Sequence, residues 1–282
     1  MGRNENVLIF EDTEKICKEN KKLAESIICS VKSQKLILEN EVFNTDDSSN
    51  NKEKATVVVS KKRTLQAASA YRGLKTVVHN FASATNPGGG VVKGSSAQEE
   101  CLCRCSTLYF CLNTKEMING FYNPHRAAKD PIHNDDIIYT PRVIVFKTDT
   151  SDPMLMSEQD WYSLDVITCA APNLRPVPGN QFNSGDGIEP VKVSDADLLK
   201  IHERRLSRIL DTAIANGAEA IVLGAFGCGA FQNKPEVVAL AAKNVIKNYI
   251  HAFKNIEFAV YCSPRDERNY TVFERSLKEY TG

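Results

Sequence analysis

Short apolar runs rich in β-branched residues alternate along this chain with longer segments whose apolar residues recur every three or four positions. The short runs have the length and composition of β-strands, and the longer ones have the periodicity of amphipathic helices. The predicted strands span residues 56–60, 76–82, 143–146, 165–171, 220–225 and 258–262. The predicted helices span residues 11–31, 65–71, 98–112, 194–216, 235–253 and 266–280.

This alternation predicts one α/β domain whose largely parallel or mixed sheet is covered by helices on both faces. The domain is expected to span residues 56–282, with residues 1–55 forming an N-terminal helical extension packed on it. Residues 44–54 (NTDDSSNNKEK) are polar and of low complexity, which is typical of a mobile loop. Residues 173–193 carry Pro, Gly and Asn, and two interpretations are open for them: a lid or a long connection.

Composition and charge narrow the functional classes. The chain has 282 residues, of which 35 are basic and 35 acidic, so its charge predicts no electrostatic capture of long nucleic acid. No segment has the length and hydropathy of a signal peptide or a transmembrane helix. Nine cysteines are an odd number, and several lie in apolar patterns, which favours reduced thiols over a disulfide framework. We therefore expect a soluble, intracellular protein, cytoplasmic or nuclear.

Two glycine-rich segments follow predicted strands. Gly88, Gly89 and Gly90 come after the strand at 76–82, and residues 224–231 (GAFGCGAF) come directly after the strand that begins at Ala220. Ligands of open α/β sheets lie beyond the carboxyl ends of the strands, and glycine lets the backbone approach a ligand closely. The two segments are expected to clasp an extended, phosphate-containing ligand from both sides.

Neither glycine segment matches a familiar nucleotide motif. A P-loop ends in Gly-Lys-Ser/Thr, whereas Lys93-Gly94-Ser95 reverses the first two residues. The dinucleotide fingerprint requires a third glycine three positions after Gly229, where Gln232 stands. The sequence therefore disfavours a P-loop ATPase and a Rossmann dehydrogenase, while anion binding by backbone amides remains open.

Gln98, Glu99 and Glu100 begin the predicted helix at 98–112. Ser95-x-x-Gln98 and Ser96-x-x-Glu99 both fit a capping box, so helix capping and ligand binding are equally open for Gln98 and Glu99. Glu100 fits neither box, and its position is less easily explained by capping. A carboxylic acid beside a ligand cradle is a candidate proton donor.

Metal and thiol chemistry are poorly supported. Cys101, Cys103 and Cys105 alternate within one predicted helix, so their side chains point in different directions and cannot share a metal ion. The five histidines are scattered: His79, His125, His133, His202 and His251. Cys228 is conceivable as the nucleophile of a Cys-His hydrolase, but a cysteine beside glycines at a strand end is more often a small packing residue.

Four blocks in the same order resemble microbial-type poly(ADP-ribose) glycohydrolases. These blocks are HNFASATNPGGG, QEECLCRCSTLY, VITCAAPN and GAFGCGAF, and they cover roughly residues 60–265. The resemblance implies a macrodomain-like three-layer α/β/α fold that binds the terminal ADP-ribose of a polymer. It implies no cofactor or metal, and its expected partners are poly(ADP-ribose) or ADP-ribosylated proteins, with ADP-ribose as product. A monomer that contacts neither nucleic acid nor membrane directly is expected.

The resemblance also implies roles for individual residues. Glu100 is similar in position to the catalytic acid, and Glu99 to its neighbour, which hydrogen-bonds ribose hydroxyls. The expected substrate-binding residues are Asn86, Gly88, Gly89, Gly90 and Gln98 around the scissile ribose, Gly227, Cys228, Gly229 and Ala230 at the diphosphate, and Phe231 near the ribose. No segment matches the tyrosine-bearing clasp of the animal-type enzymes, and the adenine contacts are unassigned.

The residue types suit cleavage of a ribose–ribose O-glycosidic bond, with ADP-ribose released mainly from the free end. A carboxylic acid can protonate the departing oxygen and then, as a carboxylate, activate a water. Two other functions use the same pocket: removal of a single ADP-ribose from a protein, and binding of ADP-ribose without hydrolysis. The two adjacent acids argue against a pure binder, because binding alone requires no acid beside a diphosphate.

Overall fold

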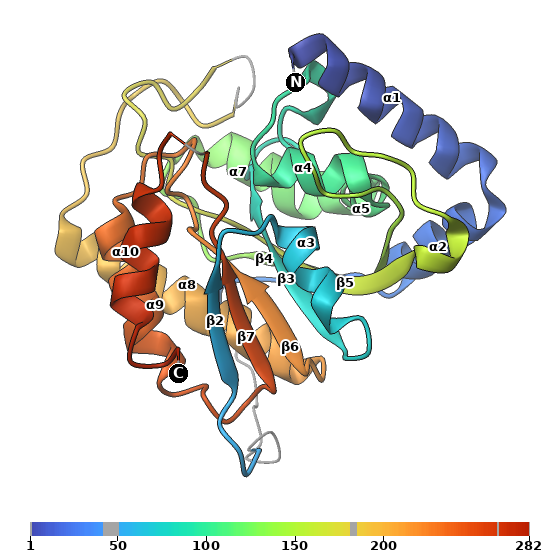
Figure 1. The fold of residues 1–282 in the computed structure, drawn as a ribbon. Helices are drawn as coiled ribbons and strands as arrows, with labels where there is room; N and C mark the ends of the chain where they lie inside the picture. Colours follow the sequence, from blue (N-terminus) through green and yellow to red (C-terminus); the bar gives the residue numbers. More distant parts are fainter. Residues whose placement is uncertain (1, 42–50, 181–184, 264, 282) are drawn as a thin grey trace.

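The computed structural model describes residues 2–41, 51–180, 185–263 and 265–281. Seven strands form one mixed sheet in the order β1-β4-β5-β3-β6-β7-β2 (Figure 1). The strands are β1 (Lys35–Ile37), β2 (Thr56–Ser60), β3 (Thr76–Ala82), β4 (Ile137–Val145), β5 (Tyr162–Ala170), β6 (Ala220–Leu223) and β7 (Asn255–Ala259). Strands β5, β3, β6, β7 and β2 are parallel, whereas β4 and β1 run antiparallel to their neighbours.

Helices cover both faces of this sheet (Figure 1). On one face lie α8 (Asp195–Ala215), α9 (Pro235–Ile246) and α10 (Arg268–Leu277). The other face is covered by α1 (Arg3–Glu19), α2 (Lys21–Lys32), α3 (Thr64–Ala68), α4 (Gln98–Cys105), α5 (Leu108–Leu112) and α6 (Lys115–Met117), and α7 (Asn123–Ala128) follows. The predicted three-layer α/β/α architecture with a mixed sheet is confirmed.

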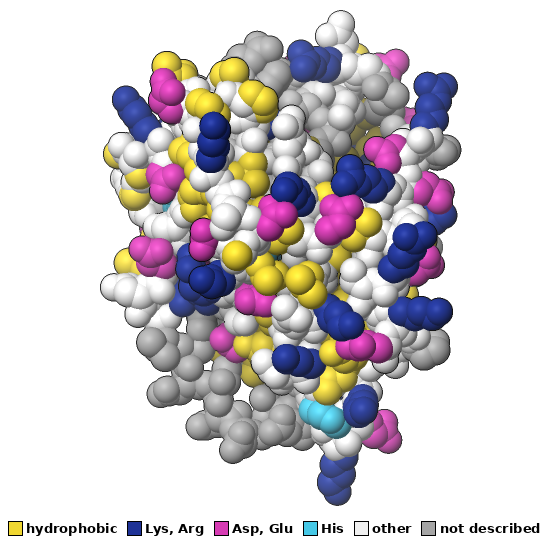
Figure 2. Space-filling model, turned by 90° about the vertical axis from the view of Figure 1, so that its left-hand side faces the viewer, with side chains coloured by type: hydrophobic (Ala, Val, Ile, Leu, Met, Phe, Trp, Pro, Cys, Tyr) yellow, Lys and Arg dark blue, Asp and Glu magenta, His cyan; other side chains and the backbone are white. Residues whose placement is uncertain are grey.

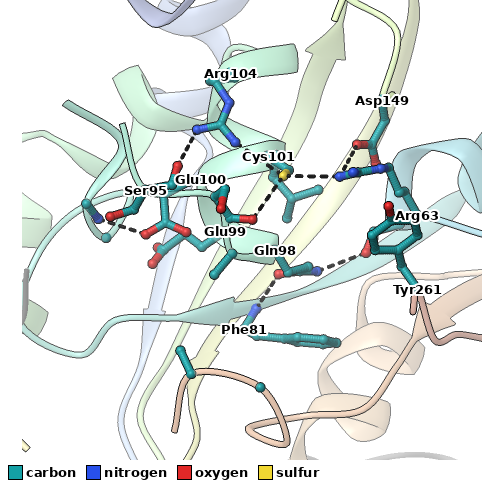
Figure 3. Close-up of a pocket in the computed structure, with 18 of the residues that line it drawn as sticks. Arg63, Phe81, Ser95, Gln98, Glu99, Glu100, Cys101, Arg104, Asp149 and Tyr261 are labelled. Atoms are coloured by element: carbon teal, nitrogen blue, oxygen red, sulfur yellow. Dashed lines mark hydrogen bonds and ion pairs between the residues drawn. The ribbon is translucent and has the colours of Figure 1, made fainter. Parts of the chain in front are cut away.

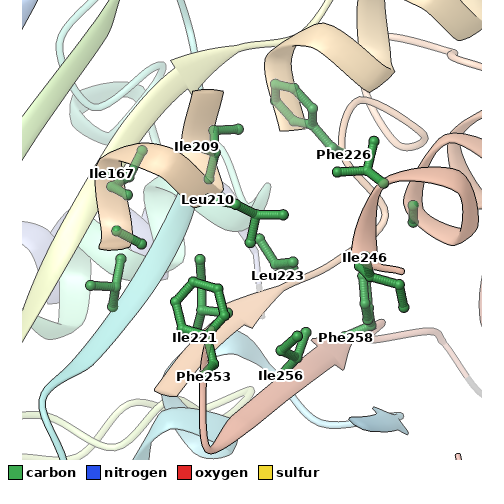
Figure 4. Packing of buried hydrophobic residues seen from close by; sticks show 14 of the residues in the cluster. Ile167, Ile209, Leu210, Ile221, Leu223, Phe226, Ile246, Phe253, Ile256 and Phe258 are labelled. Carbon is green, nitrogen blue, oxygen red and sulfur yellow. The ribbon is translucent and has the colours of Figure 1, made fainter. Parts of the chain in front are cut away.

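Two hydrophobic layers sandwich the sheet, and the strands supply both. Within β3, Val77 belongs to the layer under α8–α10, while the next residue, Val78, belongs to the layer under α1 and α3–α6. Ile221 and Val222 of β6 divide in the same way. Successive side chains of a strand point to opposite faces, so a strand buried on both faces is apolar throughout. Figure 4 shows the first layer, where Leu210 faces the sheet.

The predicted strands at 56–60 and 76–82 coincide with β2 and β3, but several helix boundaries were wrong. The single helix expected at 11–31 is two helices, because Asn20 ends α1 and caps α2 by accepting a hydrogen bond from the Leu23 N–H at 3.2 Å. The helix expected at 98–112 breaks after α4, where Ser106 bridges to Val145 of β4. The predicted strand at 258–262 lies earlier, as β7.

The N-terminal segment is more than helical. Residues 35–37 form β1, an edge strand paired with β4, which the sequence pattern did not predict. Of the polar stretch 44–54, residues 44–50 lie outside the described residues. At its end the Asn51 N–H donates to the His251 carbonyl at 2.6 Å, and the chain then enters β2. A domain boundary at residue 55 stays a prediction.

Charged side chains of both signs are interspersed on the side of the molecule that carries α9 and α10 (Figure 2). Several are paired there: Lys61 with Glu267, Lys234 with Asp195, Arg268 with Glu236 and Lys243 with Glu279. Such exposed pairs contribute little to stability. Throughout the described ranges, no helix is both long and apolar enough to cross a membrane.

Candidate active site

A cleft of about 890 Å³ opens at the carboxyl ends of the parallel strands. Its wall includes residues that follow each of these strands: Arg63 after β2, Gly89 after β3, Ala171 after β5, Gly227 after β6 and Tyr261 after β7. Both predicted glycine cradles therefore lie at the same edge of the sheet and line one cavity. Figure 3 shows the side chains of Gln98, Glu99 and Glu100, at the start of α4, in the wall of this cleft.

The first glycine loop wraps closely around the carboxyl groups of α4. Gly88 and Gly89 have φ angles of +66° and +60°, a region that glycine adopts without strain. A Cβ atom on Gly89 would lie 2.5 Å from Glu100 Oε1 and 3.0 Å from Glu99 Oε2. Glycine is required at position 89 because any side chain would occupy the space of these carboxyls.

The second glycine loop is equally tight at Gly227, whose φ is +76°. A Cβ atom there would lie 2.6 Å from both the Ala171 Cβ and the Asn233 Nδ2. Gly229, Ala230 and Phe231 continue the cleft wall. At Gly227, Gly229 and Ala230 the loop thus borders the cavity without a large side chain.

Capping does not explain Gln98 or Glu99. The N-cap of α4 is Ala97, and no side chain forms a cap hydrogen bond there. Instead, the Gln98 side chain accepts from the Phe81 N–H at 2.9 Å and donates to the His79 carbonyl at 2.7 Å and to Thr64 Oγ1 at 3.1 Å (Figure 3). The capping-box interpretation was wrong, and Gln98 connects α4 to the end of β3.

Glu99 is buried, with 2% of its surface exposed. Its Oε2 accepts from the Ser83 N–H at 2.7 Å and its Oε1 from Asn80 Nδ2 at 3.3 Å. Desolvation by burial, followed by the neighbouring Glu100 carboxylate, raises the pKa of Glu99 well above its usual value. Its oxygens are occupied by the segment that leaves β3.

Glu100 is held at one oxygen only. Its Oε1 accepts from the Gly90 N–H at 2.8 Å, whereas the buried Oε2 has no hydrogen-bond partner among the described residues. Burial raises the pKa of Glu100, opposed by the Gly90 hydrogen bond and by the charge of Arg104. A carboxyl group whose pKa is raised and that has one oxygen free is suited to general acid catalysis.

The alternating cysteines of α4 point in different directions, as predicted. Cys101 lines the cleft, where Arg104 Nη2 lies 3.3 Å and Arg63 Nη1 3.5 Å from its sulfur (Figure 3). Cys105, one turn later, is buried and also borders the cleft, while Cys103 is buried in the core and does not. Within the part of the chain that the structure describes, no group of three or more His, Cys, Asp or Glu residues could hold a metal ion. All nine cysteines are free thiols.

Three of the predicted site residues do not line the cleft: Asn86, Gly88 and Cys228. The Asn86 carbonyl accepts from the Gly89 N–H at 2.9 Å. This hydrogen bond helps to shape the first glycine loop, although Asn86 itself does not border the cleft. The Cys228 thiol faces the Phe226 carbonyl at 3.8 Å and packs against the hydrophobic core, and burial raises its pKa. This environment favours the packing interpretation of Cys228 over a nucleophile.

The cleft extends to residues that the sequence analysis missed. Arg63 lies over the Tyr261 ring at 4.1 Å and 4.0 Å from Asp149 Oδ1 (Figure 3). At the other end Asn6 of α1 donates to the Gly94 carbonyl at 3.1 Å, and Arg3 also lines the cavity. Arg63 follows the predicted strand at 56–60 and Tyr261 lies near the end of the one at 258–262, so their place at the sheet edge was a usable signal; nothing in the sequence pattern pointed to α1.

The described flanks of the segment 173–193 are tied to the first glycine loop. Asp186 is buried and accepts from Thr85 Oγ1 at 3.1 Å and from Asn173 Nδ2 at 2.6 Å. A buried carboxylate with several hydrogen bonds fixes the chain on both sides of residues 181–184, which lie outside the described residues. The described flanks thus favour a fixed connection over a lid.

The model of the family "Microbial-type PARG, catalytic domain" matches residues 4–148. The structure of poly(ADP-ribose) glycohydrolase (PARG) from Thermomonospora curvata aligns with a TM-score of 0.83 at 26% identity, covering 97% of this chain and 99% of that chain. The enzyme from Deinococcus radiodurans in complex with ADP-ribose aligns with a TM-score of 0.76 at 27% identity, covering 91% of this chain and 98% of that chain. No curated protein sequence matches the chain.

Proposed function

Because the chain belongs to the family of microbial-type poly(ADP-ribose) glycohydrolase catalytic domains, we propose that its cleft releases ADP-ribose from the free end of the polymer, with Glu100 as the catalytic acid. The observation that carries the proposal is the environment of Glu100. Its carboxyl is buried at the cleft wall, held through Oε1 by Gly90 and without a hydrogen-bond partner at Oε2 among the described residues.

The chemistry follows from this environment. The protonated Glu100 donates its proton to the ribose oxygen that departs, while positive charge develops at the anomeric carbon. The resulting carboxylate then takes a proton from a water molecule, which attacks that carbon and completes the hydrolysis. Glu99, anchored by Ser83 and Asn80, keeps its carboxyl next to the reacting ribose, where it can accept hydrogen bonds from sugar hydroxyls.

The diphosphate and the adenine of ADP-ribose can be assigned to other parts of the cleft wall. The backbone amides of Gly227, Gly229, Ala230 and Phe231 are suited to the diphosphate, because a glycine loop with a residue of positive φ can present several N–H groups to one anion. Arg63 lies over the Tyr261 ring in the cleft wall, and a cation and an aromatic face of this kind suit an adenine ring.

Helix α1 supports the preference for a free end. Asn6 and Arg3 close the cleft beside Gly94, which precedes the helix that carries Glu100. A polymer bound through an internal unit would have to continue past this helix. A terminal ADP-ribose ends within the cleft and meets no such obstacle.

Glu100→Gln tests the assignment. We expect release of ADP-ribose from automodified polymer to fall by roughly 10²–10⁴-fold, because an amide cannot donate and recover the proton. The affinity for ADP-ribose should stay within a few-fold, since the Gln carbonyl can still accept from Gly90. Normal hydrolysis by the variant would disprove the role of Glu100.

The substrate is tested in parallel on singly ADP-ribosylated protein. We expect the wild-type protein to release ADP-ribose from polymer and to leave the unit attached to protein. Faster release from the singly modified substrate would favour a mono-ADP-ribosyl hydrolase instead. Binding of ADP-ribose with no release from either substrate would favour a binding module.

A further inference from the structure

Asn233 lies just beyond the second glycine loop and is buried, with 2% of its surface exposed. Its Nδ2 donates to the carbonyl oxygens of Pro172 at 2.7 Å, Gly227 at 3.1 Å and Phe231 at 3.3 Å. Its backbone N–H also donates to the Gly227 carbonyl, at 3.0 Å. One buried amide therefore ties both ends of the loop to the segment that follows β5.

The orientation of this amide is fixed by its surroundings. Three carbonyl oxygens can only accept hydrogen bonds, so the Asn233 nitrogen must face them. Its Oδ1 lies 2.9 Å from Nε2 of His202, which reaches the loop from α8. Burial lowers the pKa of His202 to about 4, so the ring is neutral at ordinary pH and must carry its proton on Nε2.

Asn233 and His202 support the second glycine loop on the side away from the cleft. A Cβ on Gly227 would lie 2.6 Å from Asn233 Nδ2, which shows how closely the backbone closes on the amide. Phe226 packs against the rings of His79 and His202, with centroids 4.4 Å and 5.6 Å away. Asn233 and His202 are absent from the cleft wall, while Gly227 and Phe231 belong to it.

We propose that Asn233 is a positioning residue that holds the peptide N–H groups of residues 227–231 in their anion-binding arrangement, with His202 fixing its amide. Asn233 then sets the affinity for the diphosphate of the ligand and leaves the affinity for the nucleoside unchanged. This inference rests on the proposed function, in which the loop binds the diphosphate. Without the three hydrogen bonds the loop loses its support, and its N–H groups no longer converge on one anion.

The test is Asn233→Asp in the full chain, because a carboxylate has the same shape but cannot donate to three carbonyls. We expect the Kd for ADP-ribose to rise roughly tenfold or more, and the Kd for adenosine to change less than about twofold. During polymer hydrolysis KM should rise in proportion while kcat falls less than about threefold. A merely structural role would weaken both ligands together.

Asn244→Ala is the matched control, because Asn244 Nδ2 donates to Glu203 between α9 and α8 and is absent from the cleft wall. If Asn233→Asp fails to fold, His202→Leu removes the donor to Asn233 and should show the same selective loss, whereas His202→Gln, which retains a donor, should show less. Equal weakening of both ligands, or none, overturns the inference. If the wild-type protein binds ADP-ribose no more tightly than adenosine, the diphosphate site itself is wrong and the proposed function fails with it.

Discussion

Glu99 and Glu100 share one helical turn but occupy different environments. Glu99 has both oxygens engaged by Ser83 and Asn80, while Glu100 has one engaged by Gly90 and one without a hydrogen-bond partner in the described chain. Burial raises the pKa of both, and the charge of Glu100 raises the pKa of Glu99 further. Ionisation of this pair is therefore unfavourable in the folded protein, as is common in catalytic sites at the expense of stability.

Glu99→Gln should therefore stabilise the protein at neutral pH. A carboxyl whose folded pKa lies above its unfolded value, about 4.3 for Glu, loses stability as pH rises from that value toward the folded pKa. We expect the free energy of unfolding to increase by on the order of 1–2 kcal/mol at pH 7.5 and to be unchanged near pH 4. Asn80 can accept from the new amide, because its Oδ1 has no other hydrogen-bond partner in the described chain.

Urea unfolding at several pH values measures this effect. Exposed Glu116→Gln controls for the loss of one negative charge and should change stability little. A loss of stability in Glu99→Gln at pH 7.5, or a gain independent of pH, would contradict the buried-charge account.

Residue spacing alone could locate these acids but not separate capping from ligand binding. The Ser-x-x-Gln and Ser-x-x-Glu patterns around Gln98 and Glu99 are the same in either case. Their hydrogen-bond partners, Phe81 and Ser83, come from the segment around the end of β3 and become neighbours only in the fold. Glu100 was distinguishable because it fits neither capping pattern.

Helix α1 forms part of the cleft wall through Arg3 and Asn6. Gly94 has a φ of +74°, and a Cβ there would collide with the Arg3 carbonyl, so the start of α1 lies directly on the loop that leads to α4. The Asn6 side chain holds the same contact through the Gly94 carbonyl. The start of α1 can lie this close to the loop only because residue 94 is glycine.

Gly94→Ala should displace the start of α1 and open that end of the cleft. We expect oligomers of ADP-ribose to appear among the products of polymer hydrolysis, because internal units could then pass the helix. Gel separation of the products over time measures the change. Gly73→Ala is the control, because a Cβ there meets no atom within 4 Å. Products consisting of ADP-ribose alone, at an unchanged rate, would show that α1 does not set the preference for the free end.

Element types were predictable where periodicity was strong, and element ends were not. Strands β2 and β3 coincide with their predicted ranges because each begins with a run of β-branched residues, Thr-Val-Val. The apolar spacing continues through the breaks at Asn20 and Ser106, so the pattern gave no stop signal there. Both breaks depend on polar hydrogen bonds: Asn20 caps α2, and the Ser106 hydroxyl donates to the Leu102 carbonyl at 2.7 Å.

At the scale of the whole molecule, the sequence pattern could not predict the order of the strands in the sheet. Strand β2 pairs with β7, at the opposite end of the chain, and β3 lies between β5 and β6. The expectation that glycine segments after parallel strands meet at one edge needed no strand order, because it depends only on strand direction. The general place of the site was therefore predictable, while the contribution from α1 was not.

Asp135, just before β4, is bound by two arginines of α8, and one of them also reaches the end of β5. Its carboxylate accepts from Arg204 and, at 2.7 Å, from Arg205, which is fully buried and also donates to the Ala170 carbonyl at the end of β5. Burial alone would raise the pKa of Asp135, but the hydrogen bonds and charges of the two arginines outweigh it and lower the pKa. The carboxylate form thus stabilises the fold.

Asp135→Asn should lower the free energy of unfolding by about 3–5 kcal/mol at pH 7, because it leaves the buried Arg205 charge uncompensated. A carboxyl with a lowered folded pKa gives its full stabilisation above the unfolded value, about 3.9, and loses it as pH falls through the folded pKa. The difference between variant and wild type should therefore shrink below about pH 4. Urea unfolding between pH 3 and 7 measures it, with Glu25→Gln, from an exposed pair with Lys21, as the control. A constant difference across this range would mean that the ionised carboxylate of Asp135 does not hold α8 against the sheet.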